Sequence, residues 1–175
     1  MKTIINSCIA TRYHDFCMGH RVVGHEGKCR HLHGHNYRIT FAVRPKVSDL
    51  SLPNSERSGK MALDHVGRVL DFSVIKSTLC NWIEEHWDHK FMAWNEDALI
   101  NAMCTATPEL YCDEEQREQF LDSLVFVHFN PTAENIAQYF IEIGNELLQE
   151  HHCELAWVEL SETRKCGVRV ETSNQ

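Results

Sequence analysis

Two stretches in the first quarter of the chain alternate apolar and polar residues. Residues 3–18 and 33–44 are predicted strands, and the second shows the pattern best: Ile39, Phe41 and Val43 alternate with the polar residues Arg38, Thr40 and Arg44. A period of two with one apolar face is typical of a strand that buries one side. The sequence therefore predicts that both segments belong to a half-buried sheet.

Two later stretches place apolar residues at helical spacing. The first follows Asp71, a residue type that favours helix N-caps, and continues to about Trp87. The second is opened by Pro131 and Thr132. Its apolar stripe consists of Ile136, Tyr139, Phe140, Ile143 and Leu147. Stripes of this kind predict amphipathic helices packed on a core.

The remaining segments complete an α+β pattern. Residues 45–66 contain two prolines, a glycine and several serines, which predicts a long hairpin connection. The acidic stretch 96–123 is predicted to be a solvated loop or a short exposed helix. Short strands are expected at 124–129, 154–162 and 167–172. The order of strand pair, helix, strand, helix and strand pair favours helices on one face of an antiparallel sheet.

Composition narrows the functional classes. A chain of 175 residues suits one domain, here expected over 1–175 with insertions at about 45–66 and 96–123. A net charge of −8 argues against a nucleic-acid partner. The eight cysteines are scattered, unlike a disulfide scaffold. The N-terminus does not resemble a signal peptide and no run has transmembrane length, so a cytoplasmic protein without a membrane partner is expected.

A histidine cluster provides the first candidate chemistry. His33 and His35 lie one residue apart in a predicted strand, so their side chains share one face. His20, at the end of the preceding strand, can supply a third nitrogen across the sheet. Three histidines without a fourth protein ligand are typical of a catalytic zinc, whose open position takes water or substrate.

Cys29 lies four residues before His33 and has three interpretations. It is a fourth zinc ligand, a free thiolate acting beside the metal, or an inert buried cysteine. Lys28 and Arg30 flank it, and nearby cations increase the thiolate fraction of a cysteine. The spacing alone leaves all three interpretations open.

Two acidic positions add further candidates. Asp88 precedes His89, and a carboxylate beside a histidine can orient the ring for proton transfer. The alternative is a histidine that interacts with the dipole at a helix C-terminus. Glu162 ends a predicted strand and could accept paired donors from an amidine-like ring, although a surface glutamate is the commoner case.

Six motifs in order resemble one known family. They are Phe16–Arg21, Cys29–Tyr37, Gly67–Phe72, Asp88–His89, Asn130–Asn135 and Glu162–Thr163. Together they resemble the 6-pyruvoyltetrahydropterin synthase family, and in particular its bacterial 6-carboxytetrahydropterin synthases of queuosine biosynthesis. Three residues separate the cysteine from His-Gly-His, as in that branch. The run Lys90–Asn95 departs from the family pattern.

The resemblance implies a zinc site, a catalytic group and a substrate-binding group. The zinc ligands would be His20, His33 and His35. The catalytic residues would be Cys29, Asp88 and His89, and the substrate-binding residues Glu162, Thr132 and Glu134. Cys29 would be the thiolate that abstracts a proton, Asp88 and His89 an acid/base pair, and Glu162 the anchor of the pterin ring. Capping of the second helix is the alternative role of Thr132.

The same resemblance implies a fold and a reaction. The fold is the tunnelling fold, in which an antiparallel four-stranded sheet is backed by two helices. Subunits of this fold assemble into an oligomeric barrel, and two stacked trimers form a hexamer with active sites at the subunit junctions. The reaction is zinc-dependent conversion of 7,8-dihydroneopterin triphosphate to 6-carboxy-5,6,7,8-tetrahydropterin, acetaldehyde and triphosphate, catalysed by a lyase. The alternatives are 6-pyruvoyltetrahydropterin formation without carbon–carbon cleavage and a non-catalytic structural zinc module.

Overall fold

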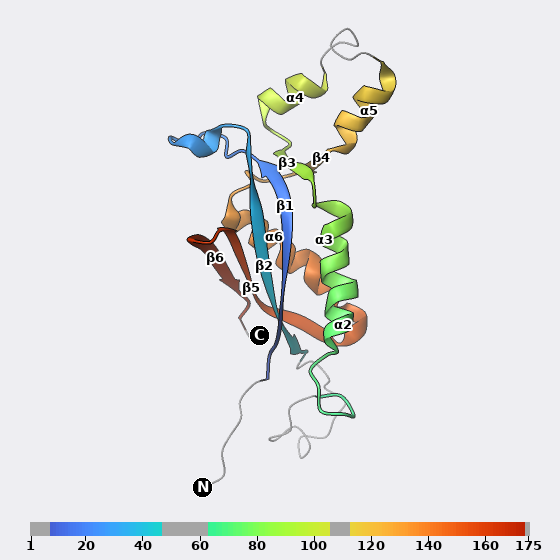
Figure 1. Cartoon of the computed structure of the whole chain (residues 1–175). Coiled ribbons are helices and arrows are strands. Elements are labelled where there is room, and N and C mark those ends of the chain that lie inside the picture. Colours follow the sequence, from blue (N-terminus) through green and yellow to red (C-terminus); the bar gives the residue numbers. More distant parts are fainter. Residues whose placement is uncertain (1–7, 47–62, 106–112, 174–175) are drawn as a thin grey trace.

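A curved six-stranded sheet forms the centre of the protein (Figure 1). The structure is a computed structural model and describes residues 8–46, 63–105 and 113–173. The strand order is β4-β3-β1-β2-β5-β6. The strands are β1 (Ala10–His20), β2 (His33–Pro45), β3 (Lys90–Trp94), β4 (Leu124–Val127), β5 (Cys153–Thr163) and β6 (Cys166–Glu171).

Four of these strands form the predicted antiparallel sheet, and two extend it. Neighbours among β1, β2, β5 and β6 pair antiparallel, whereas β3 pairs parallel with β1 and β4 parallel with β3. The expected four-stranded antiparallel sheet is therefore wrong in strand number and in direction at one side. The added strand β3 contains the apolar run Phe91–Trp94 without alternation, which is usual for a parallel strand with little exposed surface.

The boundaries of the first strand also differ from the prediction. β1 begins at Ala10, and the predicted residues 3–7 lie outside the described residues. It continues to His20, two residues beyond the predicted end. The extension matters because it places His20 within the sheet, directly opposite His33 of β2.

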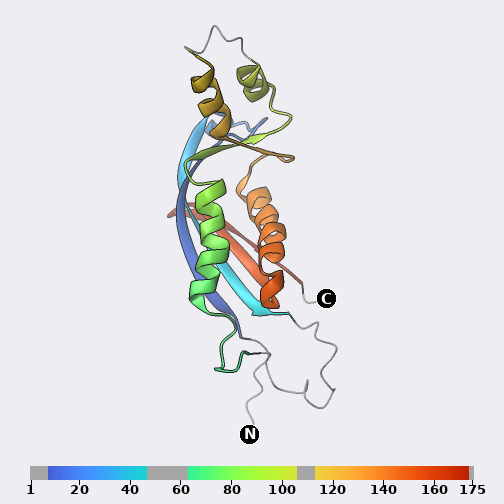
Figure 2. The ribbon, with the colours of Figure 1, turned by 90° about the vertical axis from the view of Figure 1, so that its right-hand side faces the viewer.

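Both predicted helices are present and cover one face of the sheet (Figure 2). The first consists of α2 (Phe72–Ile75), a π-helical turn η2 (Lys76–Cys80) and α3 (Asn81–His86). The second is α6 (Ala133–Leu147), followed by the turn η4 (Gln149–His151). Their fully buried side chains facing the sheet include Ile75, Leu79, Ile83, Ile136 and Phe140. The apolar stripes thus pack on the sheet, except at the start of the first helix, where the predicted stripe residue Phe72 is 57% exposed.

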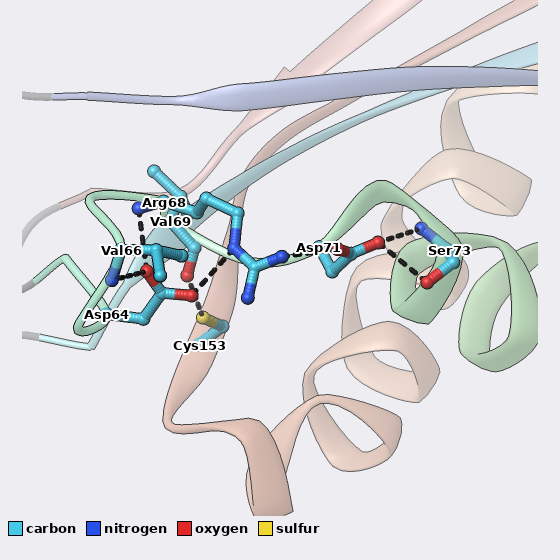
Figure 3. Close-up of polar contacts among 7 residues, drawn as sticks. All are labelled: Asp64, Val66, Arg68, Val69, Asp71, Ser73 and Cys153. Carbon is cyan, nitrogen blue, oxygen red and sulfur yellow. Dashed lines mark hydrogen bonds and ion pairs between the residues drawn. The ribbon is translucent and has the colours of Figure 1, made fainter.

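Hydrogen bonds and ion pairs hold the segment that precedes α2 (Figure 3). The carboxylate of Asp64 accepts hydrogen bonds from the backbone N–H groups of Val66 and Arg68. The guanidinium of Arg68 then joins Asp64 to Asp71, whose carboxylate caps α2 through Ser73. Most of the predicted hairpin connection, residues 47–62, lies outside the described residues.

The acidic segment contains two helices, α4 (Ala98–Cys104) and α5 (Glu114–Asp122). They lie beyond the end of the sheet (Figure 1), and residues 106–112 between them are not described. The prediction of a loop or one short helix is corrected, because Asp97 and Asp113 each cap a helix. Asp97 is only 2% exposed and lies 3.1 Å from Arg21, the residue after His20.

None of the helices in the described ranges contains an apolar stretch of transmembrane length.

Candidate metal site and catalytic groups

Three histidines converge on the helix-facing side of β1 and β2. His20 and His33 are direct cross-strand partners, and His35 lies two residues further along β2. Because strand side chains alternate, all three rings point to the same face. One nitrogen from each ring lies within 4.8 Å of the other two, so the three can share one ion.

Backbone carbonyls orient two of these rings. The Nδ1–H of His20 donates to the carbonyl of Pro131 at 2.7 Å, and that of His33 donates to the carbonyl of His31 at 2.8 Å. A proton on Nδ1 leaves the lone pair of Nε2 available to a metal. Burial lowers the pKa of His20 to about 4, which keeps this ring neutral.

The nitrogens that face the centre of the cluster lack partners of their own. In the part of the chain that the structure describes, the Nε2 atoms of His20 and His35 are buried and accept or donate no hydrogen bond. Buried polar atoms are rarely left in this state, so each of the two points to a ligand from outside the chain. Three imidazole nitrogens fit zinc, which takes nitrogen ligands and tolerates an open position. The donor set therefore fits the metal that the sequence predicts.

Glycines bring the backbones around the histidines close together. A Cβ on Gly34, between His33 and His35, would lie 3.0 Å from the carbonyl oxygen of Met18. A Cβ on Gly19, the cross-strand partner of Gly34, would lie 2.6 Å from the ring of Phe91. The absence of a side chain at Gly34 lets the backbones of β1 and β2 approach closely, and its absence at Gly19 leaves room for Phe91 of β3.

Glu162 lies next to the histidine cluster. Its two carboxylate oxygens are 3.7 Å from the Nε2 of His20 and 3.9 Å from the Nε2 of His35. The pairing of β5 with β6 shifts register between Ser161 and Thr163, so Glu162 occupies a β-bulge. Bulges often re-aim side chains next to functional sites.

Tyr37 is a second neighbour of the cluster. It is the last residue of the motif Cys29–Tyr37, but no role was predicted for it. Tyr37 is 0% exposed, and its ring contacts the rings of His20 and His35 edge-on, at centroid distances of 5.9 and 5.5 Å. Within the described chain, its hydroxyl has no hydrogen-bond partner. Burial, followed by the charges of Glu162 and Cys29, raises the pKa of Tyr37, so the hydroxyl stays protonated and can donate.

Cys29 lies in a short 3-10 turn, η1 (Lys28–Arg30), between β1 and β2. Its carbonyl accepts a hydrogen bond from the N–H of Val22 at 2.8 Å, which ties the turn to the end of β1. The thiol is half-buried and forms no disulfide. Its sulfur is not among the donor atoms that share the 4.8 Å cluster, which favours a free thiol over a fourth ligand.

Asp88 and His89 form the predicted pair, at a different place on the sheet. The carboxylate of Asp88 accepts hydrogen bonds from His89 Nδ1 and from the N–H of Cys17, each at 2.7 Å. Partial burial opposes ionisation of Asp88, but these bonds hold its pKa below the usual value. Across residues 8–46, 63–105 and 113–173, no hydrogen bond or ion pair joins Asp88 or His89 to the three metal-site imidazoles.

The exposure of His89 explains what the pair can reach. Its side chain is 80% exposed, and its backbone has a φ of +59°. A groove of about 1320 Å³ is lined by residues that include Asp88, His89, His35 and Glu162. The pair therefore presents its ring to solvent and to anything that binds against this face.

The motif that opens α6 supports the metal site more than the sequence indicated. Thr132 caps α6 by accepting the N–H of Asn135, which is the alternative role, and Glu134 is exposed in the first turn. Asn130, for which the sequence predicted no role, bonds both the N–H and the carbonyl of Val23. Together with the carbonyl of Pro131, it holds the segment after His20. No sequence signal distinguishes these contacts from ordinary helix capping.

Comparison of the sequence with known proteins identifies related chains. The family model described as 6-pyruvoyl tetrahydropterin synthase matches residues 9–173. A curated relative from Rickettsia typhi, named 6-carboxy-5,6,7,8-tetrahydropterin synthase, is 30% identical over 161 residues, or 91% of this chain and 97% of the relative. A relative of the same name from Haemophilus influenzae is 29% identical over 149 residues, or 85% and 87% of the two chains.

Solved structures share the fold. An uncharacterised protein from Wolinella succinogenes matches with a TM-score of 0.74 at 24% identity, over 95% of this chain and 98% of that one. The 6-pyruvoyl tetrahydropterin synthase of Caenorhabditis elegans matches with a TM-score of 0.56 at 19% identity, over 98% and 100%. At these identities the likeness establishes the fold.

Proposed function

The chain belongs to the 6-pyruvoyl tetrahydropterin synthase family, and we propose that it is a zinc-dependent 6-carboxytetrahydropterin synthase. Family and relatives make it an enzyme that converts pterins. The proposed reaction consumes 7,8-dihydroneopterin triphosphate and water and yields 6-carboxy-5,6,7,8-tetrahydropterin, acetaldehyde and triphosphate. The single observation that supports a catalytic site most directly is the cluster of three oriented histidines with Glu162 beside it.

Zinc is the proposed cofactor, held by His20, His33 and His35. When bound, it supplies a Lewis acid that polarises oxygen atoms of the substrate side chain. The carbonyls of Pro131 and His31 keep two of the rings in the tautomer that binds metal.

Cys29 is the proposed base. As a thiolate it removes a proton from the substrate side chain, and its position on a turn tied to β1 keeps it near the histidine cluster. Tyr37, whose pKa is raised in part by the charge of Cys29, has a protonated hydroxyl available to donate to an oxyanion nearby. These two groups give the site one proton acceptor and one donor.

Asp88 and His89 are the proposed acid/base pair. The short bond from His89 Nδ1 to Asp88 fixes the ring and leaves Nε2 free to transfer protons as triphosphate leaves. Because His89 is exposed and does not contact the histidine cluster of its own chain, we propose that the pair completes the site of a neighbouring subunit. This requires an oligomer with sites at subunit junctions, and the homohexamer implied by the family resemblance is the proposed assembly.

Glu162 is the proposed anchor of the pterin ring, with Thr132 and Glu134 beside the binding site. The pyrimidine edge of a pterin offers an amino group and a ring N–H side by side, which match the two oxygens of a carboxylate. Glu162 is 23% exposed, so such a pair of hydrogen bonds would be partly shielded from water.

The experiment is a product assay on the zinc-loaded protein with 7,8-dihydroneopterin triphosphate. Acetaldehyde together with a 6-carboxy product is the expected result. Triphosphate release without acetaldehyde would replace the proposal by 6-pyruvoyltetrahydropterin formation. Stoichiometric zinc without pterin binding or turnover would leave a structural zinc module.

A further inference from the structure

The Glu162 carboxylate faces the same imidazole atoms that a metal would bind. We propose that Glu162 is itself a metal ligand when no pterin is bound, and that pterin binding releases it. The inference rests on the proposed function for the identity of the pterin and the metal. Its first step, ligation of the metal by Glu162, depends only on the contacts of this chain.

The first argument is geometric. Each carboxylate oxygen approaches a different ring, at 3.7 Å from the Nε2 of His20 and 3.9 Å from the Nε2 of His35. These are the two nitrogens that are buried without a hydrogen-bond partner among the described residues. An ion placed between them and His33 would meet the Glu162 carboxylate as a fourth donor, and zinc accepts carboxylate oxygen together with histidine nitrogen.

The second argument concerns protons. His20 donates its Nδ1 proton to the carbonyl of Pro131, so in the neutral ring Nε2 is an acceptor. The nearest Glu162 oxygen lies 3.7 Å from this Nε2, which is too long for a direct hydrogen bond. A metal ion between the two groups would bind the lone pair of the ring and the carboxylate oxygen together.

The third argument is that the backbone frees Glu162 for this position. The β-bulge leaves it without a partner on β6, where Ser161 pairs with Gly167 and Thr163 with Cys166. A Cβ on Gly167 would lie 2.7 Å from the carbonyl oxygen of Leu160, so this bulge needs a glycine opposite it. Over the described ranges, His20 and His35 are the only basic side chains with a nitrogen within 4.0 Å of the Glu162 carboxylate.

The consequence is an exchange of partners. One carboxylate cannot bind the metal and both donors of a pterin edge at the same time. Release of Glu162 to the pterin would leave His20, His33 and His35 as the protein ligands and would open one position for oxygen atoms of the substrate side chain. Glu162 would thereby link activation of the side chain to binding of the ring.

The test uses Co²⁺ as a visible substitute for zinc, measured on the metal-free full-length protein. Affinity comes from titration with Co²⁺ alone, and the ligand set from the absorption bands of the bound ion. Glu162→Gln removes the charged ligand and keeps the shape. Glu159→Gln is the matched control, because Glu159 lies on the same strand with its side chain on the opposite face.

For Glu162→Gln we expect Co²⁺ affinity to fall by at least the roughly 10-fold that loss of an outer-shell partner costs, with shifted absorption bands. Glu159→Gln should match the unchanged protein in both. Unchanged affinity and bands in Glu162→Gln, with circular dichroism showing a folded protein, would overturn the inference.

A second measurement tests the exchange. Addition of 7,8-dihydroneopterin to the unchanged Co²⁺ protein should shift its bands, and bands that stay unchanged at saturating pterin would refute release of Glu162. The product assay remains a separate matter. If Glu162→Gln loses Co²⁺ affinity but the unchanged protein shows no turnover, Glu162 is a metal ligand and the proposed reaction is wrong. If the unchanged protein turns over and Glu162→Gln binds Co²⁺ normally, Glu162 is a pterin anchor and not a ligand.

Discussion

Removal of one hydroxyl group should make the metal-free protein more stable. Tyr37 is fully buried, and its hydroxyl has no hydrogen-bond partner in the described structure. Its ring stacks on Phe16 at a centroid distance of 5.3 Å. Phenylalanine at this position keeps that contact and the edge contacts with the histidines. The change therefore isolates the buried hydroxyl.

The magnitude follows from the penalty for a buried polar group without a partner. That penalty is about 1–3 kcal/mol, and Tyr37→Phe removes it from the folded state. For a chain of this length, each kcal/mol raises Tm by roughly 2–4 °C. Tyr13→Phe is the control, because Tyr13 is 57% exposed and its hydroxyl loses little hydration on folding. We expect that variant to change stability by less than about 0.5 kcal/mol.

Urea denaturation of the metal-free proteins at one fixed protein concentration gives the free energies of unfolding. A Tyr37→Phe variant less stable than the unchanged protein would refute the reasoning, because the hydroxyl would then have a partner in solution. The same substitution should lower the activity of the zinc-loaded enzyme. If Tyr37 donates to bound substrate, Tyr37→Phe should reduce turnover although it raises the stability of the metal-free protein.

Three further predictions concern other parts of the molecule. Asp97→Ala should destabilise the protein by about 2–4 kcal/mol in urea denaturation, because it removes the cap of α4 and the anion beside Arg21. Asp97→Asn keeps a cap and should lose about 1 kcal/mol less. Equal losses in the two variants would show that the cap contributes nothing. Cys29→Ala should retain one zinc per chain by metal analysis and lose turnover, whereas loss of zinc would make Cys29 a ligand. Hydrogen bonds, first of all from the N–H of Arg68, lower the pKa of Asp64 to about 2. The contribution of the Asp64 carboxylate to stability is therefore present above the unfolded pKa near 4 and is lost as the pH falls through about 2. The amide chemical shift of Val66 should titrate with a midpoint near 2, and a midpoint near pH 4 would disprove the assignment.

Periodicity was sufficient to predict the antiparallel part of the sheet and the two helices that cover it. Alternation along β2 is enough by itself to place His33 and His35 on one face, and the strand pairing adds His20 directly opposite. The stripe containing Ile136 and Phe140 predicted the buried side of α6. These features depend on residues close together in the sequence, which is why a pattern reports them.

Other features depended on contacts that no local pattern records. β3 has no alternation because it pairs parallel in the interior of the sheet, and only its neighbours β1 and β4 define it. In the acidic segment, charge obscured two short helices whose signals were the caps Asp97 and Asp113. The carbonyl of Pro131 orients His20 across 111 positions of sequence. Such a backbone contact leaves no residue-type signature.

The left-handed backbone of His89 limits how this position can vary. Most residues with a Cβ are strained at a φ of +59°, whereas glycine adopts it freely and asparagine, aspartate and histidine adopt it more often than other residues. The conformation is held because the N–H of His89 donates to the carbonyl of Cys17 at 2.7 Å while Asp88 accepts the N–H of the same residue. Replacement of His89 by alanine therefore mixes the loss of an imidazole with a backbone penalty, whereas asparagine removes the imidazole and tolerates the turn. Backbone conformation therefore favours asparagine, aspartate or glycine as replacements for this histidine, and the effect of an alanine substitution measures more than the loss of the imidazole.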